Sequence, residues 1–304
     1  MIRSVVKLWD AAPHNAFPDL VRHRGGWICA FREGATHVSA DGLLRVLRSV
    51  DGEHWEAVAL LQWAGGDLRD VDLSVTPEGR LLLATAVCFE QPVDGGRHHS
   101  VTWLSDDGVH WEGPFRCPSG VGTWRWSVAW HAGHGYSFGY TGKDKAGGLY
   151  RSGDGRSWQE VLRPAFPEPQ SYPNETSMVF LDDATMLCLL RRDKGSATAL
   201  LGTARPPYTD WQWRDLGVRI GGPKLLRLGD GRLLAAVRLY GAEDARTALC
   251  WIDPEQPRLD EWLALPSGGD TSYAGMVEHE GEVWVVYYAS HEGRTAIYLA
   301  RVGL

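Results

Sequence analysis

Apolar and polar residues follow a pattern along this chain that repeats about every fifty residues. In each repeat, two short apolar runs flank a polar turn, and the run Arg80–Val87 leaves one such turn. The six turns are His23–Gly26, Pro77–Arg80, His131–Gly135, Asp182–Thr185, Gly229–Arg232 and His279–Glu282. Two apolar runs joined by a short polar turn are typical of a β-hairpin. No stretch of useful length has the 3.6-residue period of a helix, so the pattern predicts an all-β protein.

A second motif, S-x-D-G-x-x-W, occurs at Ser49–Trp55, Ser105–Trp111 and Ser152–Trp158. It predicts a tight turn in which Ser or Asp binds the local backbone, Gly takes a positive φ and Trp covers the hairpin. Each copy follows a hairpin by about thirty residues, so the repeating unit is two inner strands, a connection and an outer hairpin. Six such units predict one domain, residues 1–304, folded as a six-bladed β-propeller of four-stranded antiparallel blades. The segment Ala296–Val302 should pair with residues near the N-terminus and close the ring.

Composition narrows the class of protein. A hydrophobic content of 44% is that of a globular protein, and a net charge of −7 gives no electrostatic reason to expect nucleic acid. No segment is apolar for long enough to span a bilayer, and the first residues lack the apolar core of a signal peptide. Five scattered cysteines without a C-x-x-C motif are typical of free thiols in a reducing compartment, which predicts a cytoplasmic protein. The histidine pairs lack further ligands at zinc spacing, so neither a metal nor a cofactor is expected.

Equivalent positions of successive blades in a propeller converge on one mouth of the central channel. The first strands begin near Asp19, Asp70, Arg125, Glu175, Lys224 and Tyr273, and the second strands end near Arg32, Phe89, Tyr140, Arg191, Arg238 and Tyr288. Antiparallel pairing brings both sets to the same rim. A solvated rim of mixed charge is the alternative interpretation. We prefer a functional site, because charge beside buried inner strands is costly without a purpose.

The S-x-D-G-x-x-W turns resemble shortened Asp-box repeats of sialidases and related six-bladed glycosidases. Asn174-Glu175, followed by a strand pair that ends at Arg191, resembles the sialidase segment with the Glu and the second arginine. Arg238 resembles the third arginine, and Asp270–Tyr273 resembles the tyrosine segment. The resemblance implies a retaining exo-glycosidase that cleaves a terminal acidic sugar such as sialic acid. Tyr273 would be the nucleophile and Glu175 its base.

The chemistry of such a substrate accounts for these residue types. A sialic acid carries a carboxylate on its anomeric carbon, which would repel a carboxylate nucleophile but not a phenol. The planar fork of arginine binds both oxygens of a carboxylate. The first arginine of the family lies in a pattern like Tyr-Arg-Ile-Pro, whereas the segment His14–Leu20 contains no arginine. We therefore expect Arg32 or Arg125 to join Arg191 and Arg238.

The acid/base and the remaining contacts are predicted from position. Asp70 is the preferred acid/base, while the loop after the second strand offers His37 and Asp41, the latter more typical of a turn. His291 and Glu292 end the second strand of the last blade, where they would contact the substrate or make buried hydrogen bonds.

Two other functions fit the same residues. Carboxylates Asp19, Asp70 and Glu175 could act on a different sugar, one as acid and one as base or nucleophile. A propeller that binds a glycan without cleaving it is the third possibility, favoured by the absence of the first arginine. Glu175 beside Tyr273 speaks against it, since a lectin has no need of that pair.

Overall fold

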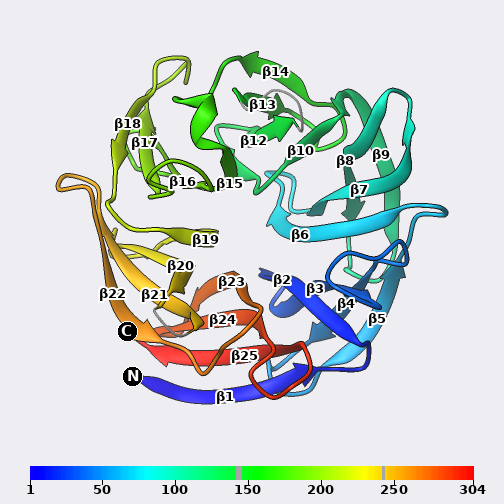
Figure 1. The fold of residues 1–304 in the computed structure, drawn as a ribbon. Coiled ribbons are helices and arrows are strands. Elements are labelled where there is room, and N and C mark those ends of the chain that lie inside the picture. Colours follow the sequence, from blue (N-terminus) through cyan, green and yellow to red (C-terminus); the bar gives the residue numbers. More distant parts are fainter. Residues whose placement is uncertain (142–145, 242–243) are drawn as a thin grey trace.

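A computed structural model describes residues 1–141, 146–241 and 244–304, and it confirms the six-bladed β-propeller (Figure 1). Six antiparallel sheets surround a central axis, and the first strand of each sheet lies nearest the centre. Within the described residues there is no α-helix, only a short 3-10 turn, η1 (Pro169–Ser171). None of the described segments is a helix long and apolar enough to cross a membrane.

The strands of the first three blades follow one another from the channel outward. Blade one contains β2 (His14–His23), β3 (Gly26–Gly34), β4 (Leu43–Ser49) and β5 (Glu56–Leu61). Blade two contains β6 (Asp67–Val75), β7 (Leu81–Val93), β8 (Gly96–Ser105) and β9 (Trp111–Val121). Blade three has an interrupted inner strand, and it contains β10 (Thr123–Arg125), β11 (Ala129–His131), β12 (His134–Thr141), β13 (Gly148–Ser152) and β14 (Gln159–Leu162).

The remaining blades have the same order. Blade four contains β15 (Pro173–Phe180), β16 (Met186–Arg192), β17 (Leu200–Ala204) and β18 (Gln212–Asp215). Blade five contains β19 (Ile220–Arg227), β20 (Leu233–Tyr240), β21 (Ala245–Asp253) and β22 (Arg258–Ala264). Blade six contains β23 (Thr271–His279), β24 (Glu282–Ala289), β25 (Ala296–Gly303) and β1 (Ile2–Trp9).

The N-terminal strand closes the ring, as the sequence predicts. β1 pairs antiparallel with β25 and forms the outer edge of blade six, so the two chain ends lie close together (Figure 1). The amino group of Met1 donates to the carbonyl of Gly303 at 3.0 Å. Blade six therefore combines strands from both ends of the chain.

The hydrophobic core is divided among the interfaces between neighbouring blades. Six buried clusters each combine side chains of two adjacent blades, and Ile28 with Leu83 and Phe138 with Leu190 illustrate two of them. The side chains that alternate outward from each sheet therefore pack against the next sheet. This packing fixes the blades around the channel.

The three S-x-D-G-x-x-W segments join the two outer strands of blades one to three. In the first, the Ser49 hydroxyl accepts from the Gly52 N–H at 2.8 Å, and Gly52 has a φ of 79°. Asp51 accepts from two backbone N–H groups, and the Trp55 indole donates to the Gly52 carbonyl at 3.0 Å. The same bonds recur at Gly108 and Gly155. These are the turn interactions that the residue types predict, and they lie away from the channel.

Five of the inner strands contain a β-bulge at the same place. Between the two regular pairs that flank the bulge, the inner strand advances by three residues while its partner strand advances by two. In blade two, for example, β6 runs from Arg69 to Asp72 while β7 runs from Ala86 to Ala84. The inserted pairs are Phe17-Pro18, Asp70-Val71, Asn174-Glu175, Gly222-Pro223 and Tyr273-Ala274. A bulge re-aims a side chain, and bulges are common beside active sites. The three residues predicted to be catalytic, Asp70, Glu175 and Tyr273, all lie in these bulges.

Candidate active site

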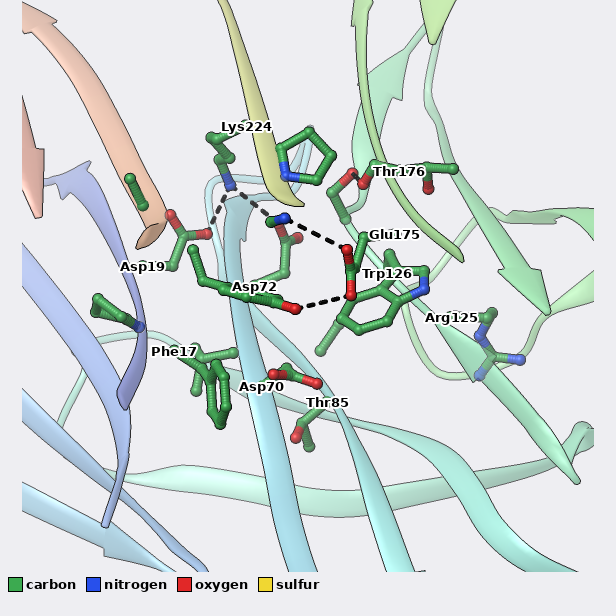
Figure 2. Close-up of a pocket in the computed structure, with 18 of the residues that line it drawn as sticks. Phe17, Asp19, Asp70, Asp72, Thr85, Arg125, Trp126, Glu175, Thr176 and Lys224 are labelled. Carbon is green, nitrogen blue, oxygen red and sulfur yellow. Dashed lines mark hydrogen bonds and ion pairs between the residues drawn. The ribbon is translucent and has the colours of Figure 1, made fainter. Parts of the chain in front are cut away.

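The bulges line a small cavity of about 60 Å³ at the centre of the propeller. Its walls come from the inner strands of all six blades, and Figure 2 shows carboxylates converging there from several of them. The lining residues with side-chain chemistry include Asp19, Asp70, Asp72, Trp126, Glu175, Lys224 and Tyr273. A cavity of this volume holds only a few water molecules. A larger ligand would therefore place only part of its structure in this cavity.

Tyr273 and Glu175 are in direct contact. The phenol of Tyr273 donates to Glu175 Oε1 at 2.8 Å, and the backbone N–H of Gly222 reaches Glu175 Oε2 at 3.3 Å. Burial, followed by the nearby Glu175 carboxylate, raises the pKa of the Tyr273 phenol well above its usual range. The resting phenol is therefore neutral, and the carboxylate that would take its proton is already its hydrogen-bond acceptor.

Tyr273 is also held in an unusual backbone conformation. Its φ is 48°, and Asp70 in the equivalent bulge of blade two has a φ of 44°. Positive φ is uncommon for a bulky residue and persists only where the surrounding structure enforces it. Bulge geometry, rather than local sequence preference, thus aims both side chains at the cavity.

Two arginines lie against the Tyr273 side chain. Arg191 Nη1 donates to both oxygens of Glu175, at 2.9 and 2.8 Å, and to the Tyr273 hydroxyl at 3.0 Å. Arg238 lies with its guanidinium carbon 5.4 Å from the centre of the Tyr273 ring, and it donates to Asp270 at 3.0 Å. The predicted grouping of Glu175, Arg191, Arg238 and Tyr273 is therefore present.

Asp70 projects into the same cavity without a protein partner. Within the part of the chain that the structure describes, no hydrogen bond reaches its carboxylate. Burial, opposed by the charge of Arg69 and reinforced by Glu175, raises the pKa of Asp70 to about 6. A carboxyl group with this pKa can both give and accept a proton near neutral pH.

Lys224 crosses the channel and ties three blades together. Its ammonium group lies 2.7 Å from an oxygen of Asp19 and 3.0 Å from an oxygen of Asp72, as Figure 2 shows. The same carboxylates accept from backbone N–H groups of Leu73 and Val128. Burial lowers the pKa of Lys224, but the two carboxylates outweigh it and raise the pKa above its usual value. Asp19 is therefore neutralised by an ion pair.

The prediction that Arg32 binds the substrate is wrong in this structure. Arg32 is fully buried, with its guanidinium paired to Asp67 at 2.8 Å. Its other N–H groups donate to the carbonyls of Thr36 and Ser39. Arg32 thus holds the loop that follows β3 and has no group left for a ligand.

Arg125 is among the residues that line the cavity, but its guanidinium group points away from it. Its guanidinium lies between the rings of Tyr150 and Trp158, at 5.5 and 5.2 Å from their centres, and contacts the Ser100 carbonyl. Figure 2 shows this side chain turned away from the carboxylates. Two of the four predicted arginines therefore do not direct their guanidinium groups at the cavity.

The two residues predicted at the end of blade six lie outside the cavity. Glu292 is exposed and pairs with Lys7 of the outermost strand at 2.7 Å, and the His291 ring packs near Tyr298. His37, by contrast, reaches the rim, where its Nδ1 lies 2.7 Å from Asp270. Asp41 accepts from the backbone of Ala35, as expected of a turn residue.

Sequence reasoning missed the partners that occupy the centre of the channel. Asp70 and Asp72 are separated by one residue and both line the cavity, but the residue pattern does not show that they have different roles. Strand alternation is the available signal, but the bulge at Asp70-Val71 shifts the register. Asp270 and His14 were also missed as partners of His37, because they are distant from it in the sequence.

Comparisons with known proteins identify the fold. No protein-family model matches the chain, and no curated protein sequence matches it. A protein of unknown function from Dyadobacter fermentans superposes with a TM-score of 0.84 at 19% identity, over 100% of this chain and 99% of that one. The NanB sialidase of Streptococcus pneumoniae gives 0.72 at 12% identity, over 99% and 70%. An α-L-arabinanase of Penicillium chrysogenum gives 0.68 at 13% identity, over 98% of both. The chain therefore has the propeller fold of sialidases and of this arabinanase.

Proposed function

We propose that the protein is a retaining exo-glycosidase that cleaves a terminal acidic sugar by nucleophilic attack of Tyr273. The observation that carries this proposal is the contact between the neutral Tyr273 phenol and Glu175, with Arg191 bound to both. A nucleophile within hydrogen-bond reach of its base, and a base oriented by a third group, is the arrangement that covalent catalysis requires. The same fold in sialidases is consistent with it.

In the first step, the Tyr273 oxygen bonds to the anomeric carbon as Glu175 takes the phenolic proton. Asp70 gives its proton to the departing glycosidic oxygen as the bond to the anomeric carbon breaks. In the second step, Asp70 takes a proton from water, the water oxygen replaces Tyr273 on the anomeric carbon, and Glu175 returns its proton to the phenol. Configuration is retained because the group on the anomeric carbon is displaced twice, each time with inversion.

Arg191 and Arg238 would bind the carboxylate of the sugar. Arg191 contacts the hydroxyl of Tyr273, and Arg238 lies over the face of its ring. A sugar carboxylate bound by both arginines would therefore place the anomeric carbon near the phenol oxygen. Arginine is suited to this role because its fork matches the two carboxylate oxygens. The acid/base role of Asp70 is supported by its raised pKa and by its lack of a protein partner among the described residues.

A glycosidase acting on a neutral sugar through carboxylates is the second candidate. It is favoured by the segment His14–Leu20, which contains no arginine where the sialidase pattern has its first one. The ion pair of Asp19 with Lys224 reduces the available carboxylates to Asp70 and Glu175. This second function would use that pair as acid and nucleophile or base.

The test is hydrolysis of a fluorogenic α-sialoside beside neutral and uronic-acid glycosides. We expect the sialoside to be cleaved, and Tyr273→Phe to lower the turnover by about 10³-fold or more while leaving the unfolding midpoint nearly unchanged. Tyr150→Phe is the matched control, because it also removes a phenol–glutamate hydrogen bond but lies outside the cavity. Trapping with a 2,3-difluoro sialic acid should add one sugar to the peptide that contains Tyr273.

Each other result selects a different function. Cleavage of only a neutral glycoside, with full activity in Tyr273→Phe, would move the reaction to Asp70 and Glu175. Binding of glycans without cleavage of any would leave the non-catalytic propeller. In either case the tyrosine mechanism is refuted.

A further inference from the structure

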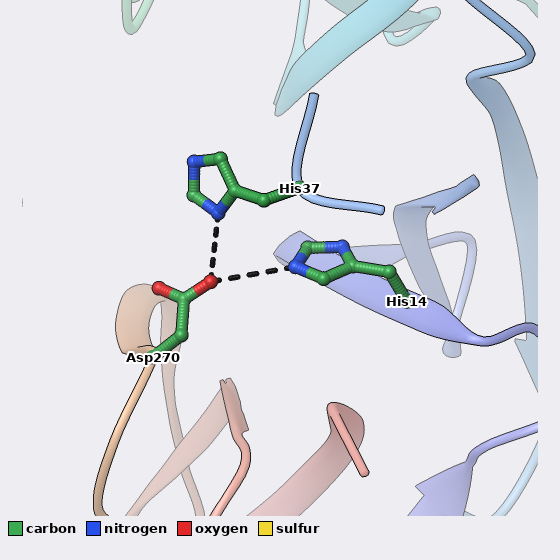
Figure 3. Close-up of side chains that lie close together, drawn as sticks. All are labelled: His14, His37 and Asp270. Atoms are coloured by element: carbon green, nitrogen blue, oxygen red, sulfur yellow. Dashed lines mark hydrogen bonds and ion pairs between the residues drawn. The ribbon is translucent and has the colours of Figure 1, made fainter. Parts of the chain in front are cut away.

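Three side chains converge at the rim between blades one and six. Asp270 Oδ2 lies 2.7 Å from His37 Nδ1 and 3.3 Å from His14 Nε2, and the three atoms all lie within 4.8 Å of one another (Figure 3). We propose that His14, His37 and Asp270 bind one divalent metal ion of the zinc class. Two imidazoles and one carboxylate suit such an ion, and three protein ligands leave coordination positions open for a ligand from the cleft.

The trio differs from the other histidine–aspartate pairs of this chain. His54 with Asp51 and His110 with Asp107 are neighbours in tight turns, and their imidazoles are 85% and 88% exposed. The rim ligands instead come from three separate segments: the start of β2, the loop after β3 and the segment before β23. His14 is buried, with 7% of its surface exposed. A convergence of this kind is assembled by the tertiary fold rather than by a local turn.

The surroundings fix two of the three ligands in place. The other oxygen of Asp270 accepts from Arg238 at 3.0 Å and from the Tyr288 hydroxyl at 2.8 Å, so Oδ2 is left facing the imidazoles. The loop that carries His37 is held by Arg32 through the carbonyls of Thr36 and Ser39. Outer partners that orient the ligands are typical of protein metal sites.

One feature opposes tight binding. When His14 binds an ion through Nε2, the ring proton must move to Nδ1, which is buried without a hydrogen-bond partner among the described residues. Without the ion, the proton on Nε2 can be donated to Asp270 and Nδ1 remains a bare lone pair. We therefore expect an affinity below that of a structural zinc site with a complete outer shell.

The position of the trio suggests what the ion would do. His14 begins the segment His14–Leu20, which contains no arginine where the sialidase pattern has its first one. The Phe17 ring contacts His37 at 5.2 Å and Tyr273 at 5.1 Å between ring centres, so one aromatic ring separates the trio from the nucleophile. An ion here would supply the missing positive charge for the substrate carboxylate. That role rests on the proposed function, whereas metal binding itself does not.

Metal binding can be measured without any glycoside. Chelator-treated full-length protein would be titrated with Zn²⁺ by calorimetry and with Co²⁺ by visible absorption. We expect one ion per chain, with His14→Ala and His37→Ala each weakening binding at least about tenfold. The double variant His54→Ala/His110→Ala is the matched control and should bind as the parent does.

Three results would overturn the site. They are no binding at millimolar Zn²⁺, equal affinity in the parent and in both rim variants, or a near-ultraviolet thiolate-to-cobalt band, which would place the ion at a cysteine. For the role in substrate binding, chelation should raise KM for an acidic glycoside several-fold and leave the KM of a neutral one unchanged. An unchanged KM for the acidic glycoside refutes that role alone. A parent enzyme that cleaves no glycoside refutes the proposed function and the role, but not the metal site.

Discussion

Replacing Lys224 by methionine tests whether the cross-channel ion pairs stabilise the fold. Methionine retains an unbranched apolar stem but removes the charge that lies 2.7 Å from Asp19 and 3.0 Å from Asp72. The side chains of these carboxylates are only 2% and 12% exposed, so little bulk water reaches them. Removing one partner of a buried ion pair typically costs about 3–5 kcal/mol. This is a large part of the total stability of a typical protein, which is about 5–15 kcal/mol.

Urea unfolding followed by tryptophan fluorescence would measure the loss. We expect Lys224→Met to be less stable by about 3–5 kcal/mol at pH 7.5 and by less at pH 5, because stranded carboxylates can then be protonated. The triple variant Asp19→Asn/Asp72→Asn/Lys224→Met leaves no buried charge in the cluster and should recover part of the loss. A loss below about 1 kcal/mol, or a loss independent of pH, would show that the carboxylates are solvated and that the reasoning is wrong.

Two further predictions concern the bulge residues. Because the pKa of Asp70 is raised to about 6 from an ordinary 3.8, its ionised form destabilises the folded state at higher pH. At 1.36 kcal/mol for each pKa unit, Asp70→Asn should stabilise the protein by about 3 kcal/mol at pH 7.5 and by almost nothing below pH 4, as urea unfolding at both pH values would show. Gly222→Ala should lower kcat/KM, because its Cβ would lie 2.6 Å from the Tyr273 ring. The control Gly217→Ala has a similar positive φ but open space around the new methyl group, so equal losses of kcat/KM in the two variants would refute the steric reason.

The fold was predictable because hairpin turns and tight turns are local. Residue type alone identifies the turn at Pro77–Arg80 and the motif at Ser49–Trp55. The spacing of such turns along the chain predicts the number of blades. The site was predictable only in part. A family resemblance identifies Glu175 and Tyr273. No residue pattern predicts the bulges that direct their side chains at the cavity. A bulge depends on how two strands pair, which is a property of the tertiary structure.

Arg32 is kept from the cavity by its partners, Asp67 and the loop after β3, which no residue pattern predicts. The prediction treats Arg32 as level with Arg191, but relative to the bulge Arg32 pairs with Ala16 as Arg192 pairs with Pro173. Arg192 behaves as Arg32 does, since it is buried and bonds to the loop after its strand through the Thr198 carbonyl. Arg238, however, pairs with Gly221 at the same place before its bulge and still contacts Tyr273 and Asp270, so register alone does not separate a structural arginine from one at the cavity.

The charge balance of the cavity connects the acidic substrate with the metal ion. Among the described side chains in and beside the cavity, four basic groups lie with six acidic ones, namely Arg69, Arg191, Arg238 and Lys224 with Asp19, Asp70, Asp72, Glu175, Asp193 and Asp270. Every one of these arginines is already paired with a carboxylate of the protein, so a substrate carboxylate would meet no surplus positive charge. A divalent ion at His14, His37 and Asp270 would balance the two sets. By linkage, an acidic sugar should then tighten metal binding by the same factor by which the metal tightens binding of the sugar. Equal Zn²⁺ affinities with and without a bound acidic sugar analogue would show that metal binding and sugar binding are not coupled.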